Sequence, residues 1–297
     1  MEYVSRGVVT AILLGLAIAN VVWAIGDWRP HDLLTYVDAA RQWVETGSPY
    51  SLTPRAEEWM LYRYAPWFAA LFVPLLGVPL PVLHAVFSAL MAGCSILAVV
   101  PMLRRYGWRA APVAAFLGTM LFGIGAAGNV QPLMVAVLAW TVGTRFGPIG
   151  IAFAASLKLL PLLFVLPYLG QREWGKAAAT FALTLLLLGP IVLFELPGRA
   201  LDAGPSNSLI HVNVVLWAIV AASAVLVAAY QSVRGEPYRW LAVCAAVILA
   251  SPRFIGYDLT ILLASTPYQA DDATPARPSR SRAHPRSGQP VTQPSER

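Results

Sequence analysis

An all-helical membrane protein is the fold class that this sequence predicts, and its composition and its long uncharged segments are the two reasons. Of its 297 residues, 58% are hydrophobic and only 12% are charged, whereas a soluble domain has about 25% charged residues. Mean hydropathy is +0.62. The forty residues 64–103 include no formal charge, and about 20 such residues span a bilayer. We therefore expect an all-α polytopic membrane protein.

The positive charge follows the pattern of a membrane protein, so no nucleic-acid partner is expected. The net charge is +6, but most basic residues border apolar segments, and such residues mark cytoplasmic ends. Arg6 precedes the first apolar segment, residues 7–26, which places the N-terminus inside and residues 27–63 outside. We expect a multi-pass protein of the plasma membrane, with its N-terminus and its C-terminal tail in the cytoplasm.

About ten spans or broken helices follow from this rule. The expected segments are residues 7–26, 81–103, 112–127, 131–144, 147–157, 161–170, 176–194, 213–230, 240–250 and a last one from 257. Residues 64–78 are interpreted as an interfacial or re-entrant helix, because a full span there would move the basic cluster 104–109 outside. Several spans are shorter than a normal crossing, which indicates tilted or broken helices around a cavity.

Two external loops and one tail complete the expected organisation. The loops are residues 27–63 and 195–211, and the transmembrane domain is residues 1–265. The last segment, Tyr257–Thr266, has only ten residues, about half of a spanning helix, and is expected to be a marginal span. Residues 266–297 are rich in proline and arginine, and a segment of this composition cannot bury enough surface to fold, so we expect a disordered tail.

The first external loop concentrates the chain's carboxylates. It holds six of the 15 acidic residues. Within it, His31–Val44 is predicted to form an amphipathic helix, because Leu33, Tyr36, Val37, Ala40 and Val44 recur at helical spacing. Asp32 lies at the start of this helix. It is either a helix cap or a general base that faces the membrane surface.

Isolated charges in apolar segments are the other candidates. Lys158 lies between apolar runs, and an ionisable group inside a membrane costs at least about 2.5 kcal/mol, which marks it as a functional candidate. The alternative is a lysine that extends to the interface. Arg253 and Asp258 either have a functional role or form a local ion pair. His211 lies at the membrane edge of the second loop and is either an interfacial residue or a participant in chemistry.

The order of several short motifs resembles glycosyltransferase family 87 (DUF2029), membrane enzymes of the GT-C superfamily. The motifs are Asp32-x-x-x-Tyr36, Ala39-Ala40, Gly47-Ser48-Pro49-Tyr50, Tyr62-Arg63-Tyr64-Ala65-Pro66, Gly128-Asn129-Val130-Gln131, Lys158-Leu159-Leu160-Pro161, Asn207-Ser208-Leu209 and Ser251-Pro252-Arg253 with Tyr257. Together they cover roughly residues 1–265. The family often shows Gly-Gln-x-Asn where this chain has Gly128-Asn129-Val130-Gln131, so its two amides are exchanged.

The resemblance implies a GT-C-like bundle and an inverting sugar transfer on the external face. It implies a polyprenyl-phosphate sugar donor, mannose foremost, and a lipid-linked or glycan acceptor. Asp32 would be the general base, and Lys158 and Arg253 would bind the donor phosphate. The candidate substrate-binding residues are Tyr36, Tyr64, Asn129, Gln131, Asn207 and His211. No cofactor is expected, and a divalent metal stays open.

Two other functions remain open from the sequence. One is a transporter or lipid flippase, in which broken helices and buried charges line a pathway. The other is a truncated, inactive relative that serves as an interaction subunit, since the apolar pattern stops near Thr266. The concentration of carboxylates in an aqueous loop favours the enzyme over the transporter.

Overall fold

The computed structural model describes residues 2–26, 30–50, 61–195, 208–235 and 237–268 of the chain. All regular secondary structure in these residues is helical, without a β-strand. The all-helical prediction is therefore confirmed for this part of the chain.

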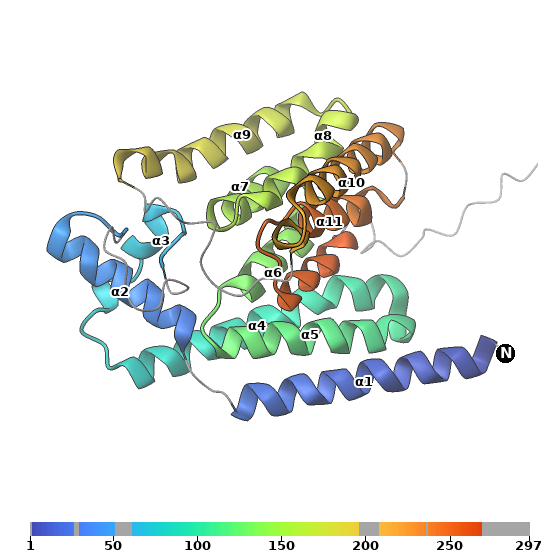
Figure 1. The fold of residues 1–297 in the computed structure, drawn as a ribbon, viewed down its shortest axis with the longest axis horizontal. Helices are drawn as coiled ribbons and strands as arrows, with labels where there is room; N and C mark the ends of the chain where they lie inside the picture. The colour runs from blue at the N-terminus through green and yellow to red at the C-terminus, as the bar shows by residue number, and fades with distance from the viewer. Residues whose placement is uncertain (1, 27–29, 51–60, 196–207, 236, 269–297) are drawn as a thin grey trace, which may run out of the picture.

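The N-terminal half forms one layer of long helices. Helix α1 (Glu2–Gly26) lies beside α5 (Ala111–Ala126), which pairs with α4 (Leu80–Tyr106) in an antiparallel hairpin (Figure 1). The short 3-10 helix η3 (Gly107–Ala110) turns the chain between them. The basic residues of the last turn of α4, Arg104 and Arg105, lie at this turn.

A small helical layer covers the opposite end of the α4–α5 hairpin, away from the N-terminus (Figure 1). It consists of α2 (His31–Thr46), α3 (Pro66–Ala70) and η2 (Val73–Leu75). The prediction of an amphipathic helix is confirmed, since α2 buries Leu33 and Tyr36 on one face. Val44 was expected on that face but is 63% exposed, because it borders an open hollow beside Ala70 and Pro74 that no side chain fills. The pieces α3 and η2 are too short to cross a bilayer.

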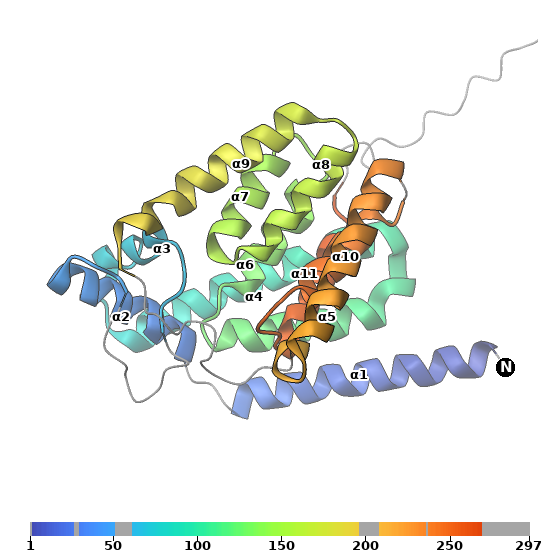
Figure 2. The ribbon, with the colours of Figure 1, turned by 45° about the horizontal axis from the view of Figure 1, so that its top comes forward.

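Short and broken helices form the C-terminal half (Figure 2). Their bounds are α6 (Gln131–Thr141), α7 (Gly147–Leu157), η4 (Leu160–Val165), α8 (Leu166–Gly170), α9 (Trp174–Leu188), η5 (Gly189–Leu193), η6 (Leu209–His211), α10 (Val214–Arg234), α11 (Arg239–Leu249) and η7 (Gly256–Ser265). Helix α7 packs between α6 and α9, and α10 packs on α11 and α8. The 3-10 segment η7 lies against α5, α6 and α11, so the last described helix closes the bundle.

Among the residues that the structure describes, three stretches are long and apolar enough to cross a membrane. They are Leu80–Ala126, which contains the α4–α5 hairpin, Trp174–Leu193 and Val214–Arg234. Leu185 is 72% exposed and Leu226 is 69% exposed. Exposed apolar residues on long helices indicate a surface that contacts lipid. The other apolar stretches of the described chain, including Gly7–Val22 within α1, are shorter, so the expected count of about ten crossings is not established.

The packed part of the chain continues past the expected end of the domain at residue 265. The backbone N–H of Tyr268 donates to the carbonyl of Ala139 at 2.8 Å, and its ring stacks on Trp140 with centroids 4.9 Å apart. The rest of the expected disordered tail, residues 269–297, lies outside the described residues.

Candidate functional site

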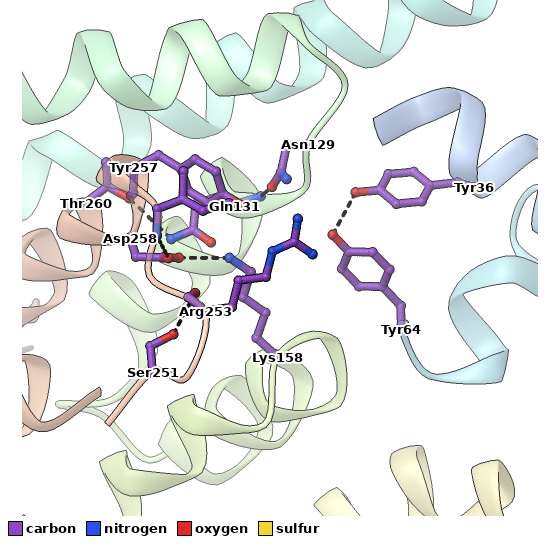
Figure 3. Close-up of polar contacts among 11 residues, drawn as sticks. Tyr36, Tyr64, Asn129, Gln131, Lys158, Ser251, Arg253, Tyr257, Asp258 and Thr260 are labelled. Carbon is purple, nitrogen blue, oxygen red and sulfur yellow. Dashed lines mark hydrogen bonds and ion pairs between the residues drawn. The ribbon is translucent and has the colours of Figure 1, made fainter. Parts of the chain in front are cut away.

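A cavity of about 730 Å³ lies where the small layer of α2 and α3 meets the short helices. Five segments that are distant in the sequence contribute to its wall: the start of α2, residues 61–64, the turn between α5 and α6, the turn after α7, and the segment from Ser251 to η7. Figure 3 shows the side chains of Tyr64, Lys158 and Arg253 approaching one another from three of these segments. Most of the residues predicted from sequence meet here: Asp32, Tyr64, Asn129, Gln131, Lys158 and Arg253.

Asp32 belongs to the first turn of α2 and is not its cap. The helix begins at His31, and the N-cap position is Pro30, which has no side-chain capping hydrogen bond. The capping interpretation of Asp32 is therefore wrong. Its carboxylate still benefits from the positive end of the helix dipole, and its side chain lines the cavity.

The turn between α5 and α6 fixes the position of Asp32. The backbone N–H of Asp32 donates to the carbonyl of Ala127 at 3.2 Å. The next residue, Gly128, has φ +84, a left-handed conformation that favours glycine. A Cβ atom on Gly128 would lie only 2.7 Å from the Cβ of Leu33. The absence of a side chain at residue 128 thus permits the close approach that seats α2 against the bundle.

Two buried amides follow Gly128 and face the cavity. The side-chain oxygen of Asn129 accepts from the backbone N–H of Gln131 at 2.8 Å. This bond orients the amide group so that its nitrogen is free to hydrogen-bond the carboxylate of Asp32. The Gln131 amide donates to Thr260 at 3.3 Å, while its buried oxygen has no partner. Each amide is 2% exposed, so an unused acceptor at Gln131 suits a hydroxyl group of a ligand.

Burial controls the acidity of Asp32. Loss of hydration raises the pKa of its carboxyl above the ordinary value of 3.8. The hydrogen bond from Asn129 and the charges of Lys158, His31 and Arg253 act in the opposite direction and lower that pKa. The carboxylate is therefore a stronger base than a surface aspartate, while nearby cations keep its ionised form accessible.

Tyr64 lies at the cavity, and Tyr36 lies behind it, farther from the cavity. Tyr36 is fully buried and donates its hydroxyl hydrogen to the Tyr64 hydroxyl at 3.2 Å (Figure 3). Only Tyr64 lines the cavity. The ring of Tyr36 packs edge-on against Tyr64 and Phe68, with centroids 5.1 and 4.9 Å away. Tyr36 thus supports Tyr64 rather than facing the cavity.

Lys158 pairs with Asp258. Its ammonium group lies 3.0 Å from the carboxylate of Asp258 and 4.7 Å from the ring centroid of Tyr257. The second carboxylate oxygen of Asp258 accepts from the backbone N–H of Ile255 at 2.9 Å. The alternative of a local pair between Arg253 and Asp258 is wrong, because both oxygens of Asp258 bond to these other groups. Lys158 ends α7 and lines the cavity, with its ammonium group on Asp258.

Arg253 is held by its backbone and leaves its guanidinium in the cavity. The Ser251 hydroxyl donates to the carbonyl of Arg253 at 2.8 Å, and the Ser208 hydroxyl donates to the carbonyl of Ser251 at 2.8 Å. Figure 3 shows the Arg253 side chain extending away from Asp258 toward Tyr64. Its buried Nε atom has no hydrogen-bond partner.

Sequence reasoning missed Arg63 as a site residue. Arg63 lines the same cavity, and its buried Nε and Nη2 atoms have no hydrogen-bond partner. The available signal was its place between Tyr62 and Tyr64, where the acidic loop returns to the membrane. Asp258 was noticed in the sequence, but its partner could not be identified there.

Two candidate residues are not brought to the cavity by the described chain. His211 ends η6 and is exposed, and it does not line the cavity. Asn207 lies outside the described residues. Its neighbour Ser208 donates to the carbonyl of Ser251, a residue of the cavity wall.

Comparisons of this chain with protein-family models, with curated proteins and with solved structures found no match.

Proposed function

We propose that this chain is a membrane glycosyltransferase that moves a sugar from a polyprenyl-phosphate donor to a lipid or glycan acceptor on the external face. One observation carries the proposal: a single cavity holds a buried carboxylate, Asp32, together with the cations Arg253 and Lys158. Transfer from a sugar phosphate needs these two kinds of group, a base for the acceptor and positive charge for the phosphate.

The reaction is a displacement at the anomeric carbon of the donor sugar. The acceptor hydroxyl oxygen forms a bond to that carbon, and the bond from the carbon to the phosphate oxygen breaks. Its electron pair stays on the phosphate, which leaves as a polyprenyl phosphate. The proton of the acceptor hydroxyl passes to the carboxylate of Asp32. Attack from the face opposite the phosphate inverts the configuration of the sugar.

The other polar groups suit a sugar between the base and the phosphate. The unpartnered oxygen of Gln131 accepts from a sugar hydroxyl. The Tyr64 hydroxyl receives a hydrogen bond from Tyr36, which leaves its own hydrogen available to a sugar or acceptor oxygen. A cavity of about 730 Å³ is in the range that accommodates a hexosyl phosphate with an acceptor group.

The amphipathic helix α2 supports a location of the sugar transfer reaction at the membrane surface. Helix α2 carries Asp32 in its first turn and lies in a chain whose longest helices are apolar and exposed. A donor with its polyprenyl chain in the bilayer would present its phosphate at this level. This geometry favours an enzyme that acts on lipid-linked substrates over one that acts on soluble sugars.

The test is a transfer assay with membranes that hold the full chain. Membranes are incubated with radiolabelled polyprenyl-phosphate mannose, and lipids are extracted; a labelled glycolipid is the expected result. Asp38→Asn is the matched control for Asp32→Asn, because Asp38 is on the same helix and its side chain is 41% exposed beside Arg41. Label should persist with Asp38→Asn and disappear with Asp32→Asn.

Two results would contradict the proposal. The first is the absence of labelled product with mannosyl, glucosyl and arabinosyl donors in turn, in membranes that contain the folded chain. The second is the recovery of intact donor on the opposite side of sealed vesicles without transfer, which would identify a transporter.

A further inference from the structure

Two arginine side chains in the cavity have buried nitrogen atoms without partners. These are Nε and Nη2 of Arg63 and Nε of Arg253. Buried polar groups in proteins are nearly always hydrogen-bonded, and an unpartnered guanidinium is among the most costly to leave so. Both side chains line the same cavity. An anionic group bound in this space would lie beside both guanidinium groups.

Arg63 and Arg253 line the same cavity, and no ion pair joins either of them to a carboxylate within the described residues. Burial lowers the pKa of Arg63, and the positive charge of Arg253 acts in the same direction. Like charges held together in a cavity are stable only when an anion lies between them. Arginine forks match the oxygens of phosphate in two-point contacts.

The carboxylates of the cavity do not supply this anion. Asp258 is bonded to the Lys158 ammonium and to the backbone of Ile255. The Asn129 amide lowers the pKa of Asp32, and no ion pair joins Asp32 to either arginine within the described chain. The charge of Lys158 is already matched by Asp258, whereas neither arginine has a carboxylate partner within the described residues, so the two arginines carry the unmatched positive charge of the cavity.

We propose that Arg63 and Arg253 together form the receptor for a phosphate group, with Arg63 as a phosphate-binding residue that the sequence did not indicate. Identification of that group as a lipid-linked phosphate rests on the proposed function. Lys158 then has a different role: its pair with Asp258 positions the loop that carries Arg253.

The charges of the cavity agree with this ligand. Among the described lining residues, the charge of Lys158 is cancelled by that of Asp258. The two positive charges of Arg63 and Arg253 and the negative charge of Asp32 leave a net charge of one positive unit. A sugar phosphodiester carries one negative charge and neutralises it. After transfer Asp32 holds the acceptor's proton, and the released phosphate monoester carries two negative charges against two arginines. The cavity is therefore neutral with donor bound and with product bound.

The test measures phosphate binding directly, without sugar transfer. The purified full chain in lipid nanodiscs is titrated with farnesyl phosphate, with inorganic phosphate and with farnesol, and binding is measured by calorimetry. Arg63→Gln and Arg253→Gln are each expected to weaken the binding of farnesyl phosphate about ten- to a hundredfold, because each removes hydrogen bonds to a charged group. Farnesol should be unaffected by either substitution.

Three variants make the test specific. Arg41→Gln is the matched control, because Arg41 lies on α2 with a side chain 56% exposed and pairs with Asp38; it should bind as the unsubstituted chain does. Arg63→Lys retains charge but loses the fork, and it should bind with intermediate affinity. Asp32→Asn removes a repelling charge and should tighten phosphate binding about threefold or more, an effect that a purely structural change would not produce.

The outcomes separate this inference from the proposed function. Tighter binding of farnesyl phosphate than of inorganic phosphate, dependent on Arg63, assigns a lipid phosphate; equal affinities assign free phosphate to the same receptor. Binding of farnesyl phosphate through Arg63 without any sugar transfer keeps the receptor and overturns the proposed enzyme. Sugar transfer by Arg63→Gln at unchanged donor KM keeps the enzyme and overturns the receptor. If Arg63→Gln does not fold, Arg253→Gln decides, since the backbone carbonyl of Arg253 still holds its loop.

Discussion

The ammonium group of Lys158 donates a 3.0 Å hydrogen bond to the carboxylate of Asp258, one hundred residues later in the chain. This contact joins the end of α7 to the start of η7 and closes the cavity on the side opposite α2. The two side chains are 31% and 16% exposed, so the pair lies between a surface pair and a fully buried one.

We expect substitutions of Lys158 and Asp258 to have non-additive effects on the free energy of unfolding. In a double-mutant cycle with Lys158→Met and Asp258→Asn, the coupling free energy of unfolding should be about 1–3 kcal/mol. The matched cycle is Lys176→Met with Glu173→Gln, whose side chains are 38% and 37% exposed at 3.1 Å; that pair should give about 0.5 kcal/mol or less. Equal coupling in the two cycles, measured by denaturant melts in detergent, would contradict a structural role for the inner pair.

Asp32→Asn should abolish sugar transfer while the chain reaches the membrane at normal abundance. The amide keeps the shape of the side chain but cannot take a proton, and removal of a general base lowers rates about 10²- to 10⁴-fold. Turnover by the purified variant, normalised to protein quantity, is the measurement. A rate equal to that of the unsubstituted enzyme would show that Asp32 does not act as the base.

The pH dependence of transfer should reflect the burial of Asp32. Only the ionised carboxylate accepts a proton, so activity is lost as pH falls through its pKa. Because burial raises that pKa above 3.8, the acid limb of kcat/KM should lie at higher pH than for an exposed aspartate. Asn129→Leu removes a hydrogen bond that lowers the pKa, and it should move the limb to still higher pH. Asp38→Asn should leave the limb in place; a limb unmoved by Asn129→Leu would contradict the assignment.

Gly128→Ala should displace the first turn of α2. The new Cβ would lie 2.7 Å from the Leu33 Cβ and 2.8 Å from the Leu33 nitrogen, so α2 must shift away from the turn that positions Asp32. We expect the free energy of unfolding to fall by about 2–4 kcal/mol, because the left-handed φ and the steric overlap both oppose a side chain there. Sugar transfer should be strongly reduced.

Gly47→Ala is the matched control for Gly128→Ala. Gly47 has a similar φ of +80, but a Cβ there would meet nothing within 4 Å. It should cost only about 1–2 kcal/mol and leave transfer unchanged at a temperature where the variant is folded. Equal effects of the two substitutions on melting temperature and transfer would show that the contact with Leu33 is unimportant.

The expected membrane orientation can be tested with single cysteines. Cys94 and Cys244 are buried, so introduced thiols dominate labelling. Glu45→Cys, on α2, should react in intact cells with a membrane-impermeant maleimide. Trp108→Cys, in η3 at a residue 90% exposed, should react only after permeabilisation. Labelling of both from the same side would contradict an α4 that crosses the bilayer.

Local sequence patterns predicted the helices of this chain closely. The expected helix at residues 31–44 is α2 (His31–Thr46), and the expected segment at 147–157 is α7 (Gly147–Leu157). These bounds follow from apolar spacing, proline and glycine, which act over a few residues. Prolines within residues 64–78 also made it possible to predict that this segment does not form one long helix. The number of crossings could not be predicted, because several helices are too short for length alone to decide.

Composition and charge order determined that this is a chain with membrane-type helices and an acidic first loop, and they indicated Asp32, Lys158 and Arg253 as unusual charges. Only the tertiary structure decided which of these charges meet. The ammonium group of Lys158 pairs with the carboxylate of Asp258. Arg253 has no carboxylate partner within the described residues, and Arg63, from a different segment, lines the same cavity. The physical reason is range: helix propensity depends on neighbouring residues, whereas the partner of a buried charge depends on how distant segments pack and on which polar groups that packing leaves unsatisfied.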